Sequence, residues 1–161
     1  MYRRLYCKSG LSLSPTGGRA GVPPRNEGTR LIHAYLLDAD RLAREELKQL
    51  LEQSGRVKVV GSSSQAAAAL EQIGRLQPQV LFVDTQLPGS LGVEAAERAL
   101  QIANNLKVVY ITSQRVHALS AFEQKAFDYI LKPPTRKRLD RVLSRLSGRA
   151  PGKGGHPFCT E

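Results

Sequence analysis

The chain has 161 residues, of which 41% are hydrophobic and 6% aromatic, a composition that suits one globular domain with an aliphatic core. It contains no run of the roughly 18–20 apolar residues that a bilayer crossing needs, which excludes a membrane-spanning helix in it. The formal net charge is +10, but half of this excess lies in the first 30 residues, so a solvated basic tail is favoured over a specific nucleic-acid surface.

Both ends of the chain are predicted to be disordered. Residues 1–30 carry Gly-Gly, Pro-Pro and Ser-Pro pairs without a hydrophobic period, and residues 148–161 are rich in Gly and Pro. We therefore expect a disordered basic arm, one folded domain over residues 31–147 and a Gly-rich disordered tail. Cys7 and Cys159 lie alone in these ends, which fits neither a disulfide framework nor a zinc site and indicates a reducing, cytoplasmic compartment.

Five short apolar runs in the folded part have the length and β-branched content of buried strands. In chain order they cover residues 32–37, 57–61, 80–83, 107–111 and 129–131. Because amphipathic stretches alternate with these runs, the sequence predicts an α/β fold with a parallel sheet and helices on both faces.

The amphipathic stretches predict five helices. The first begins after Asp40, a candidate N-cap, and ends before Gly55, while Pro78 ends the second. Together the helices are expected at residues 41–54, 66–76, about 91–103, about 116–125 and about 136–146.

Polar side chains lie where four of the predicted strands end. Asp38 follows the first strand, Asp84 the third, Thr112 the fourth and Lys132 the fifth. The carboxyl ends of parallel strands meet at one edge of a sheet, with neighbouring strands about 4.8 Å apart. The sequence therefore predicts that carboxylates, a hydroxyl and an ammonium group converge on one pocket.

Residues 82–89, Phe-Val-Asp-Thr-Gln-Leu-Pro-Gly, together with Gly92, resemble the phosphoacceptor motif of the receiver domains of two-component response regulators. Asp38 matches the acidic residue after the first strand of these domains, and Lys132 with Pro133 matches their Lys-Pro pair. The resemblance covers roughly residues 31–146. It implies a flavodoxin-like sheet with the strand order 2-1-3-4-5.

The finer sequence is similar to the receivers of LytTR-type regulators. Residues 42–45, Leu-Ala-Arg-Glu, and the stretches 118–123 and 126–129 carry this similarity. Regulators of this type continue into a DNA-binding domain, whereas this chain ends in the Gly-rich tail, so we expect no DNA-binding output domain in it. The fourth predicted helix and fifth predicted strand form a candidate surface for a homodimer.

The resemblance implies a cytoplasmic signalling domain and not an enzyme, apart from self-catalysed phosphoryl transfer and autodephosphorylation. Asp84 would take a phosphoryl group from the phosphohistidine of a sensor histidine kinase. Lys132 would pair with one phosphoryl oxygen as a point charge, and Thr112 would hydrogen-bond another. Tyr129 would then move inward behind Thr112, so that phosphorylation shifts a two-state switch.

The resemblance also implies Mg²⁺ as the cofactor, since this ion prefers carboxylate ligands and retains waters. Its protein ligands would be Asp38, Asp84 and the backbone carbonyl of Gln86, with Asp40 as a weak further ligand. The sequence departs from the family here, because Ala39 stands where receivers carry a second acid. The loss of this ligand is expected to weaken Mg²⁺ binding.

Two other functions remain open on the sequence alone. The first is a degenerate pseudo-receiver that works as an interaction or dimerisation module without phosphorylation. The second is a phosphatase similar to the haloacid dehalogenases, because Asp38 and Asp40 form an Asp-x-Asp motif after the first strand. The short chain leaves no room for the cap domain of such an enzyme, and Asp84 would have no role in it.

Overall fold

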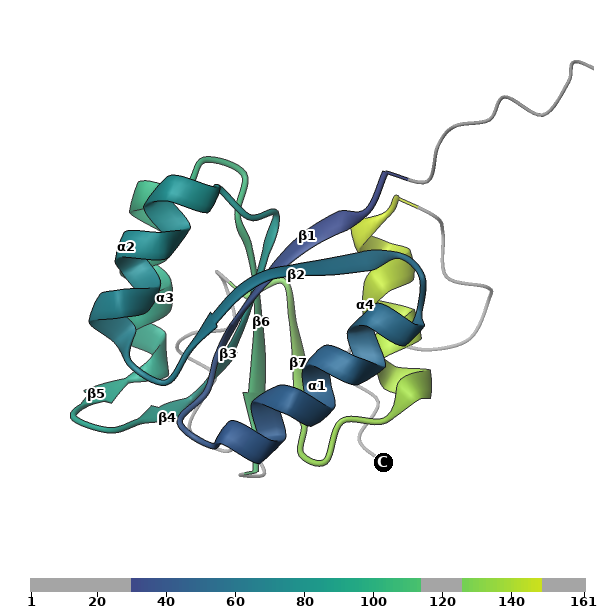
Figure 1. Cartoon of the computed structure of the whole chain (residues 1–161), viewed down its shortest axis with the longest axis horizontal. Helices are drawn as coiled ribbons and strands as arrows, with labels where there is room; N and C mark the ends of the chain where they lie inside the picture. The colour runs from purple at the N-terminus through teal and green to yellow at the C-terminus, as the bar shows by residue number, and fades with distance from the viewer. Residues whose placement is uncertain (1–29, 114–125, 149–161) are drawn as a thin grey trace, which may run out of the picture.

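The computed structural model describes residues 30–113 and 126–148, which form a central sheet with helices on both faces (Figure 1). Five parallel strands lie in the order β2-β1-β3-β6-β7. Their bounds are β1 Ile32–Leu37, β2 Val57–Ser63, β3 Val80–Asp84, β6 Lys107–Thr112 and β7 Asp128–Leu131. The predicted order 2-1-3-4-5 is therefore confirmed, with β6 and β7 as the fourth and fifth parallel strands.

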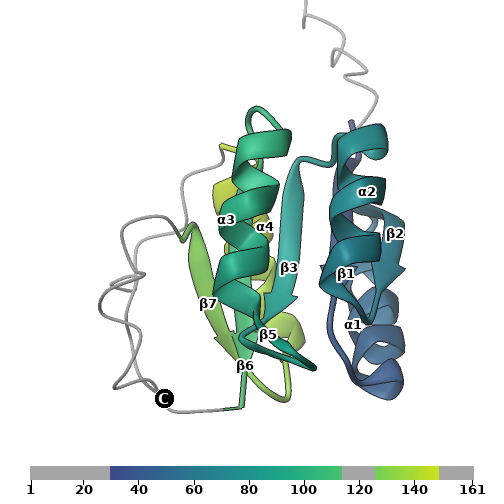
Figure 2. The same cartoon turned by 90° about the vertical axis from the view of Figure 1, so that its left-hand side faces the viewer.

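Four helices cover the sheet within the described residues. They are α1 Arg41–Gln53, α2 Ala66–Leu76, α3 Gly92–Ile102 and α4 Arg136–Leu146. Helices α1 and α4 lie on one face, and α2 and α3 lie on the other (Figures 1 and 2). The predicted helix at about 116–125, the predicted basic arm up to residue 29 and the predicted tail from residue 149 lie outside the described residues.

Strand β3 shows why the apolar runs of this chain are continuous and not alternating. Leu81 and Val83 pack toward α2 and α3, whereas Val80 and Phe82 pack toward α1 and α4. All four side chains are at most 1% exposed, because helices cover both faces of the sheet. None of the described helices has the length and apolar character to cross a bilayer.

The predicted ends of the first two helices are confirmed. The Asp40 carboxylate accepts a hydrogen bond from the Leu42 amide at 2.8 Å and caps α1. Gly55, just beyond α1, has φ +68°, a left-handed conformation that suits glycine. Helix α2 ends at Leu76 with Gln77 as its C-cap, and Pro78 prevents its continuation.

Several strand ends differ from the prediction: β2 continues to Ser63, two residues beyond its predicted end, and β7 begins one residue earlier, at Asp128. Asp84 and Thr112 are the last residues of β3 and β6 and not the first residues after them, because Asp84 pairs with Ile111 and Thr112 pairs with Leu131 across the ladder. A short hairpin of β4 (Gln86–Leu87) and β5 (Ser90–Leu91) also precedes α3. Two-residue strands are too short to show a hydrophobic period.

Candidate functional site

The carboxyl ends of β1, β3 and β7 bring Asp38, Asp84 and Lys132 together. The Lys132 Nζ donates to Asp38 Oδ2 and to Asp84 Oδ2, and both distances are 2.6 Å. The side chain of Lys132 is 21% exposed, that of Asp38 10% and that of Asp84 15%. Water therefore screens the ion pairs only partly. The structure thus brings together the two carboxylates and the ammonium group of the predicted cluster.

Hydrogen bonds fix Asp38 from several sides. Its amide donates to the Ser63 carbonyl of β2 at 3.2 Å, and its Oδ1 accepts from the Asp40 amide at 2.8 Å. The Arg44 guanidinium of α1 donates to the carbonyl oxygens of Asp38 and Ala39. The side chain of Asp38 is therefore held toward Lys132.

Asp84 is fixed by its own backbone turn and by a close glycine. Its Oδ1 accepts from the Gln86 amide at 3.0 Å, while Oδ2 faces Lys132. The chain returns at Gly92, whose amide donates to the Thr85 carbonyl at 3.0 Å. A Cβ on Gly92 would lie 1.8 Å from the Asp84 carbonyl oxygen, so only glycine fits there.

Thr112 lies at the end of β6 with its side chain buried. Its Oγ1 accepts from the Thr85 Oγ1 at 2.9 Å, and its carbonyl accepts from the Lys132 amide at 2.8 Å. Tyr129 lies in β7, three residues before Lys132, with its ring stacked on Tyr110 of β6. The predicted switch residues therefore lie on adjacent strands, and Thr112 is bonded through its carbonyl to Lys132 of the ion-pair cluster.

The electrostatics of the cluster favour a bound cation. Burial alone would lower the pKa of Lys132, but its hydrogen bonds to Asp38 and Asp84, and their negative charge, raise that pKa above its ordinary value. Lys132 is thus an ammonium group at neutral pH. Two carboxylates face this one ammonium group, so the cluster carries a net negative charge.

The donor groups meet part of what Mg²⁺ requires. Asp38, Asp84 and the Gln86 carbonyl are oxygen ligands of the kind that Mg²⁺ binds. Ala39 offers no side-chain donor, and the Oδ1 of Asp40 is engaged in capping α1. No group of three or more His, Cys, Asp or Glu side chains suited to a metal gathers within residues 30–113 and 126–148. Asp38 and Asp84 are therefore the two carboxylates that could hold such an ion, and waters would have to complete its coordination.

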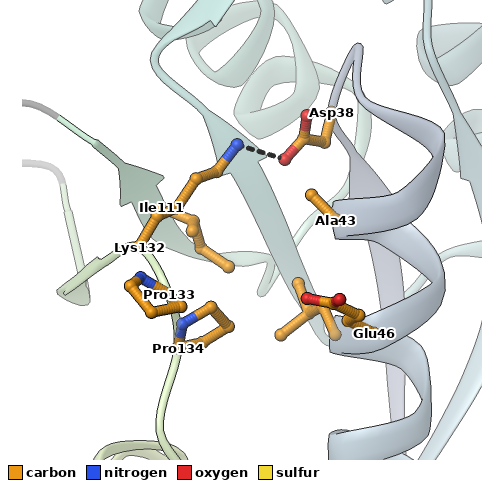
Figure 3. A pocket seen from close by; sticks show the side chains of 8 residues that line it. Asp38, Ala43, Glu46, Ile111, Lys132, Pro133 and Pro134 are labelled. Carbon is orange, nitrogen blue, oxygen red and sulfur yellow. Dashed lines mark hydrogen bonds and ion pairs between the residues drawn. The ribbon is translucent and has the colours of Figure 1, made fainter.

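A pocket of about 240 Å³ opens beside the cluster, between α1 and the segment that follows β7 (Figure 3). Its lining residues are Asp38, Ala43, Glu46, Leu47, Ile111, Lys132, Pro133 and Pro134. The Lys132–Pro133 peptide is cis, and Figure 3 shows the Lys132 side chain pointing toward Asp38. Glu46 was not predicted as a site residue, since its spacing in the sequence is that of any exposed helix residue.

Comparison with known families agrees with this geometry. The sequence model described as the response regulator receiver domain matches residues 34–144. The chain belongs to this family. The residues that this receiver domain gathers at its strand ends all fall within the matched range.

Relatives of this receiver domain carry regulatory names. An uncharacterized response regulatory protein of Vibrio cholerae is 41% identical over 116 residues, which cover 72% of this chain and 48% of the relative. The transcriptional regulatory protein BtsR of Escherichia coli (strain K12) is 35% identical over 116 residues, with the same shares covered. The receiver domain thus spans about half the length of the curated relatives that it matches.

Solved structures show the same fold. The signal receiver domain of the putative response regulator NarL from Mycobacterium tuberculosis is 31% identical with a TM-score of 0.64, and the match covers 74% of this chain and 98% of that one. The response regulatory domain of protein mrkE from Klebsiella pneumoniae is 31% identical with a TM-score of 0.65, over 73% and 96% of the two chains. This likeness shows a receiver fold, while kinship with LytTR-type regulators stays a prediction.

Proposed function

We propose that this receiver domain accepts a phosphoryl group on Asp84 from the phosphohistidine of a sensor histidine kinase. The observation that carries the proposal is the Lys132 ammonium group, 2.6 Å from the carboxylates of both Asp38 and Asp84. A solvated surface lysine would not be drawn between two acids at the ends of different strands. The arrangement supplies a nucleophile and a fixed positive charge at one point.

The transfer step follows from these contacts. A carboxylate oxygen of Asp84 attacks phosphorus, the phosphorus–nitrogen bond of the donor breaks, and its electron pair leaves with the imidazole, which takes up a proton. Lys132 exchanges its hydrogen bond with Asp84 Oδ2 for one with a phosphoryl oxygen and offsets its charge. Asp38 keeps the ammonium group in place from the other side.

Mg²⁺ would be held by Asp38, Asp84 and the Gln86 carbonyl, with Asp40 as a weak further ligand. When bound, it would shield the negative charge of the phosphoryl oxygens. Ala39 leaves one ligand position to water, so we expect weaker binding than two adjacent acids would give.

The signal would leave the site through Thr112 and Tyr129. The Thr112 hydroxyl now lies 2.9 Å from the Thr85 hydroxyl and would turn to a phosphoryl oxygen after transfer. Tyr129, whose ring already stacks on Tyr110, would then occupy the space behind it more fully. A two-state shift of this kind changes the surface around β7, where a homodimer through this strand and the preceding predicted helix would form.

The proposal extends to the setting of the domain. We expect it to act in the cytoplasm as a phosphoacceptor, with no turnover beyond self-catalysed transfer and autodephosphorylation. The Leu-Ala-Arg-Glu stretch at residues 42–45 supports kinship with LytTR-type regulators. The domain boundaries proposed from the sequence, residues 31–147, enclose the matched range 34–144.

Incubation with acetyl phosphate or beryllofluoride in the presence of Mg²⁺ tests the proposal. We expect one phosphoryl group, detected by intact mass, and its complete loss in Asp84→Ala. The exposed acid Glu45 serves as a matched control, since Glu45→Ala should be modified like the wild type. Unmodified wild-type protein would contradict the proposal.

A pseudo-receiver is the second candidate, and Ala39 is the observation that favours it. An interaction module predicts neither modification nor beryllofluoride binding at any Mg²⁺ concentration. The phosphatase alternative predicts turnover of a generic phosphate ester that is lost in Asp38→Asn. Both assays use the same preparation as the acetyl phosphate experiment.

A further inference from the structure

Tyr110 and Tyr129 form a stacked pair across the last two strands of the sheet. They are partners in the β6–β7 register, their ring centroids are 5.5 Å apart, and the planes of the rings meet at 23°. Tyr110 is 3% exposed, and the hydroxyl oxygen of Tyr129 is buried. The ring of Tyr129 thus lies inward, against the ring of Tyr110, which is part of the buried core.

The position of Tyr110 links this pair to the site. Tyr110 precedes Thr112 by two residues, so both side chains point to the same face of the sheet. Burial raises the pKa of Tyr110 to about 12, and the nearby Tyr129 phenol and Glu97 carboxylate act in the same direction. Tyr110 packs in the hydrophobic layer between the sheet and helices α2 and α3.

We propose that Tyr110 is a positioning residue that holds the Tyr129 ring inward before Asp84 carries a phosphoryl group. The stacking between the two rings favours this position over one in which Tyr129 turns toward solvent. This inference deepens the proposed switch, because a ring already held inward lowers the cost of the shift that phosphorylation drives. Its first consequence, the resting position of Tyr129, does not depend on phosphorylation.

Aromatic pairs of this geometry are stabilised enough to change a conformational ratio about two- to tenfold. Removal of the Tyr110 ring should therefore lower the ratio of inward to outward Tyr129 by that factor. Loss of the Tyr110 hydroxyl alone should leave the ratio unchanged, since the stacked faces remain. This contrast separates the role of the ring from that of the hydroxyl.

The experiment uses the full chain with ring-labelled tyrosine and compares wild type, Tyr110→Leu and Tyr110→Phe without phosphodonor. Tyr129→Phe assigns the Tyr129 ring signals. Photochemically induced dynamic nuclear polarisation with a flavin dye reports which tyrosine rings are accessible at the surface. The chemical shifts of the ring signals report stacking. We expect Tyr129 to gain exposure and lose its stacking shift in Tyr110→Leu, and to match the wild type in Tyr110→Phe.

Tyr35, which donates to Gln72 Oε1 at 3.0 Å in the same layer, is an internal control for the fold. If it responds as well, Tyr110→Met replaces Tyr110→Leu, because a methionine fills buried space without a ring. The inference is overturned if the exposure of the Tyr129 ring in the ringless variant is the same as in the wild type. It is also overturned if Tyr110→Phe exposes the Tyr129 ring as much as the ringless variant does.

A second arm adds beryllofluoride and Mg²⁺ to the same samples. If the wild type does not bind them, the proposed phosphoacceptor function fails while the resting position of Tyr129 is still measured. If it binds, the ringless variant should need about two- to tenfold more beryllofluoride to reach the same inward population. An identical response in wild type and ringless variant would overturn the link between Tyr110 and the switch.

Discussion

Asp38 and Asp84 each place an Oδ2 atom 2.6 Å from one ammonium group, so two strands that are neighbours in the sheet share a single counter-ion. Without that counter-ion the two carboxylates would face each other in a partly desolvated site. We expect Lys132→Met to lower the free energy of unfolding at neutral pH by about 2 kcal/mol. Denaturant unfolding measures this, and acidification should restore part of the loss as the carboxylates become protonated.

Lys137→Met is the matched control, since Lys137 is exposed on α4. It should change the unfolding free energy by less than about 0.5 kcal/mol. A loss in Lys132→Met that is the same at acidic and neutral pH would show that the side chain contributes through its packing and not through its charge.

Ala39→Asp should tighten Mg²⁺ binding about tenfold, because it adds a carboxylate at the ligand position that water would otherwise take. Isothermal titration of the metal measures the affinity. Asp40→Asn is the control: its oxygen still caps α1, and only a small loss is expected from it. Equal Mg²⁺ affinities for Ala39→Asp and wild type would mean that position 39 does not face the ion.

Gly92→Ala should destabilise the domain by more than about 3 kcal/mol, since its Cβ would lie 1.8 Å from the Asp84 carbonyl oxygen. Backbone atoms cannot move aside as a side-chain tip can. Gly74→Ala in α2 is the matched helical control, because its Cβ would meet only the Ile102 Cγ2 at 3.3 Å. That variant should be unchanged or up to about 1 kcal/mol more stable, and thermal unfolding of both variants decides the point.

Asp128→Ala should cost about 2–4 kcal/mol of unfolding free energy. Its carboxylate is 4% exposed and pairs with Arg138 and Arg145 of α4, each at 2.5 Å, so its loss removes the counter-charge of two guanidinium groups and leaves them only backbone carbonyl acceptors. Asp140→Ala is the control, since Asp140 is 48% exposed in its pair with Arg56 and should cost at most about 1 kcal/mol. Similar costs for the two variants in denaturant unfolding would contradict this prediction.

Stability should fall between pH about 10 and about 12. Burial raises the pKa of Tyr35 and of Tyr110 to about 12, from an ordinary value of about 10. The fold holds both phenols in the neutral form, so their contribution is complete below pH about 10 and is lost as the pH rises through the folded values. Tyr110→Phe should make the decline less steep in denaturant unfolding at several pH values, whereas a decline as steep as that of the wild type would contradict the assignment.

Most of the sheet, and the meeting of polar side chains at its carboxyl edge, could be predicted from the sequence. Runs such as residues 80–83 are apolar at every position because helices cover both faces, and parallel strands necessarily bring Asp38, Asp84 and Lys132 to one edge. These properties depend on strand polarity and not on any single rotamer.

The contacts that the sequence did not predict depend on side-chain direction. The stacking of Tyr110 on Tyr129 follows from the β6–β7 register, which periodicity does not fix. The pairing of Asp128 with two arginines depends on which side of α4 faces β7, and the sequence does not give that orientation. The contact between Thr85 and Thr112 depends on the turn that follows β3. The roles of Asp84, Thr112, Tyr129 and the Mg²⁺ ligands remain predictions.

The location of β3 in the middle of the sheet has a consequence for how this domain can evolve. The strand is bonded on both edges, to β1 and β6, and covered on both faces, so the position of Asp84 at its end is tightly fixed. The four-residue strand β7 lies at the edge of the sheet and has a described neighbour on one side only, so it is less constrained than β3. Substitutions along that edge that create a new binding surface would therefore leave the contacts among Asp38, Asp84 and Lys132 in place.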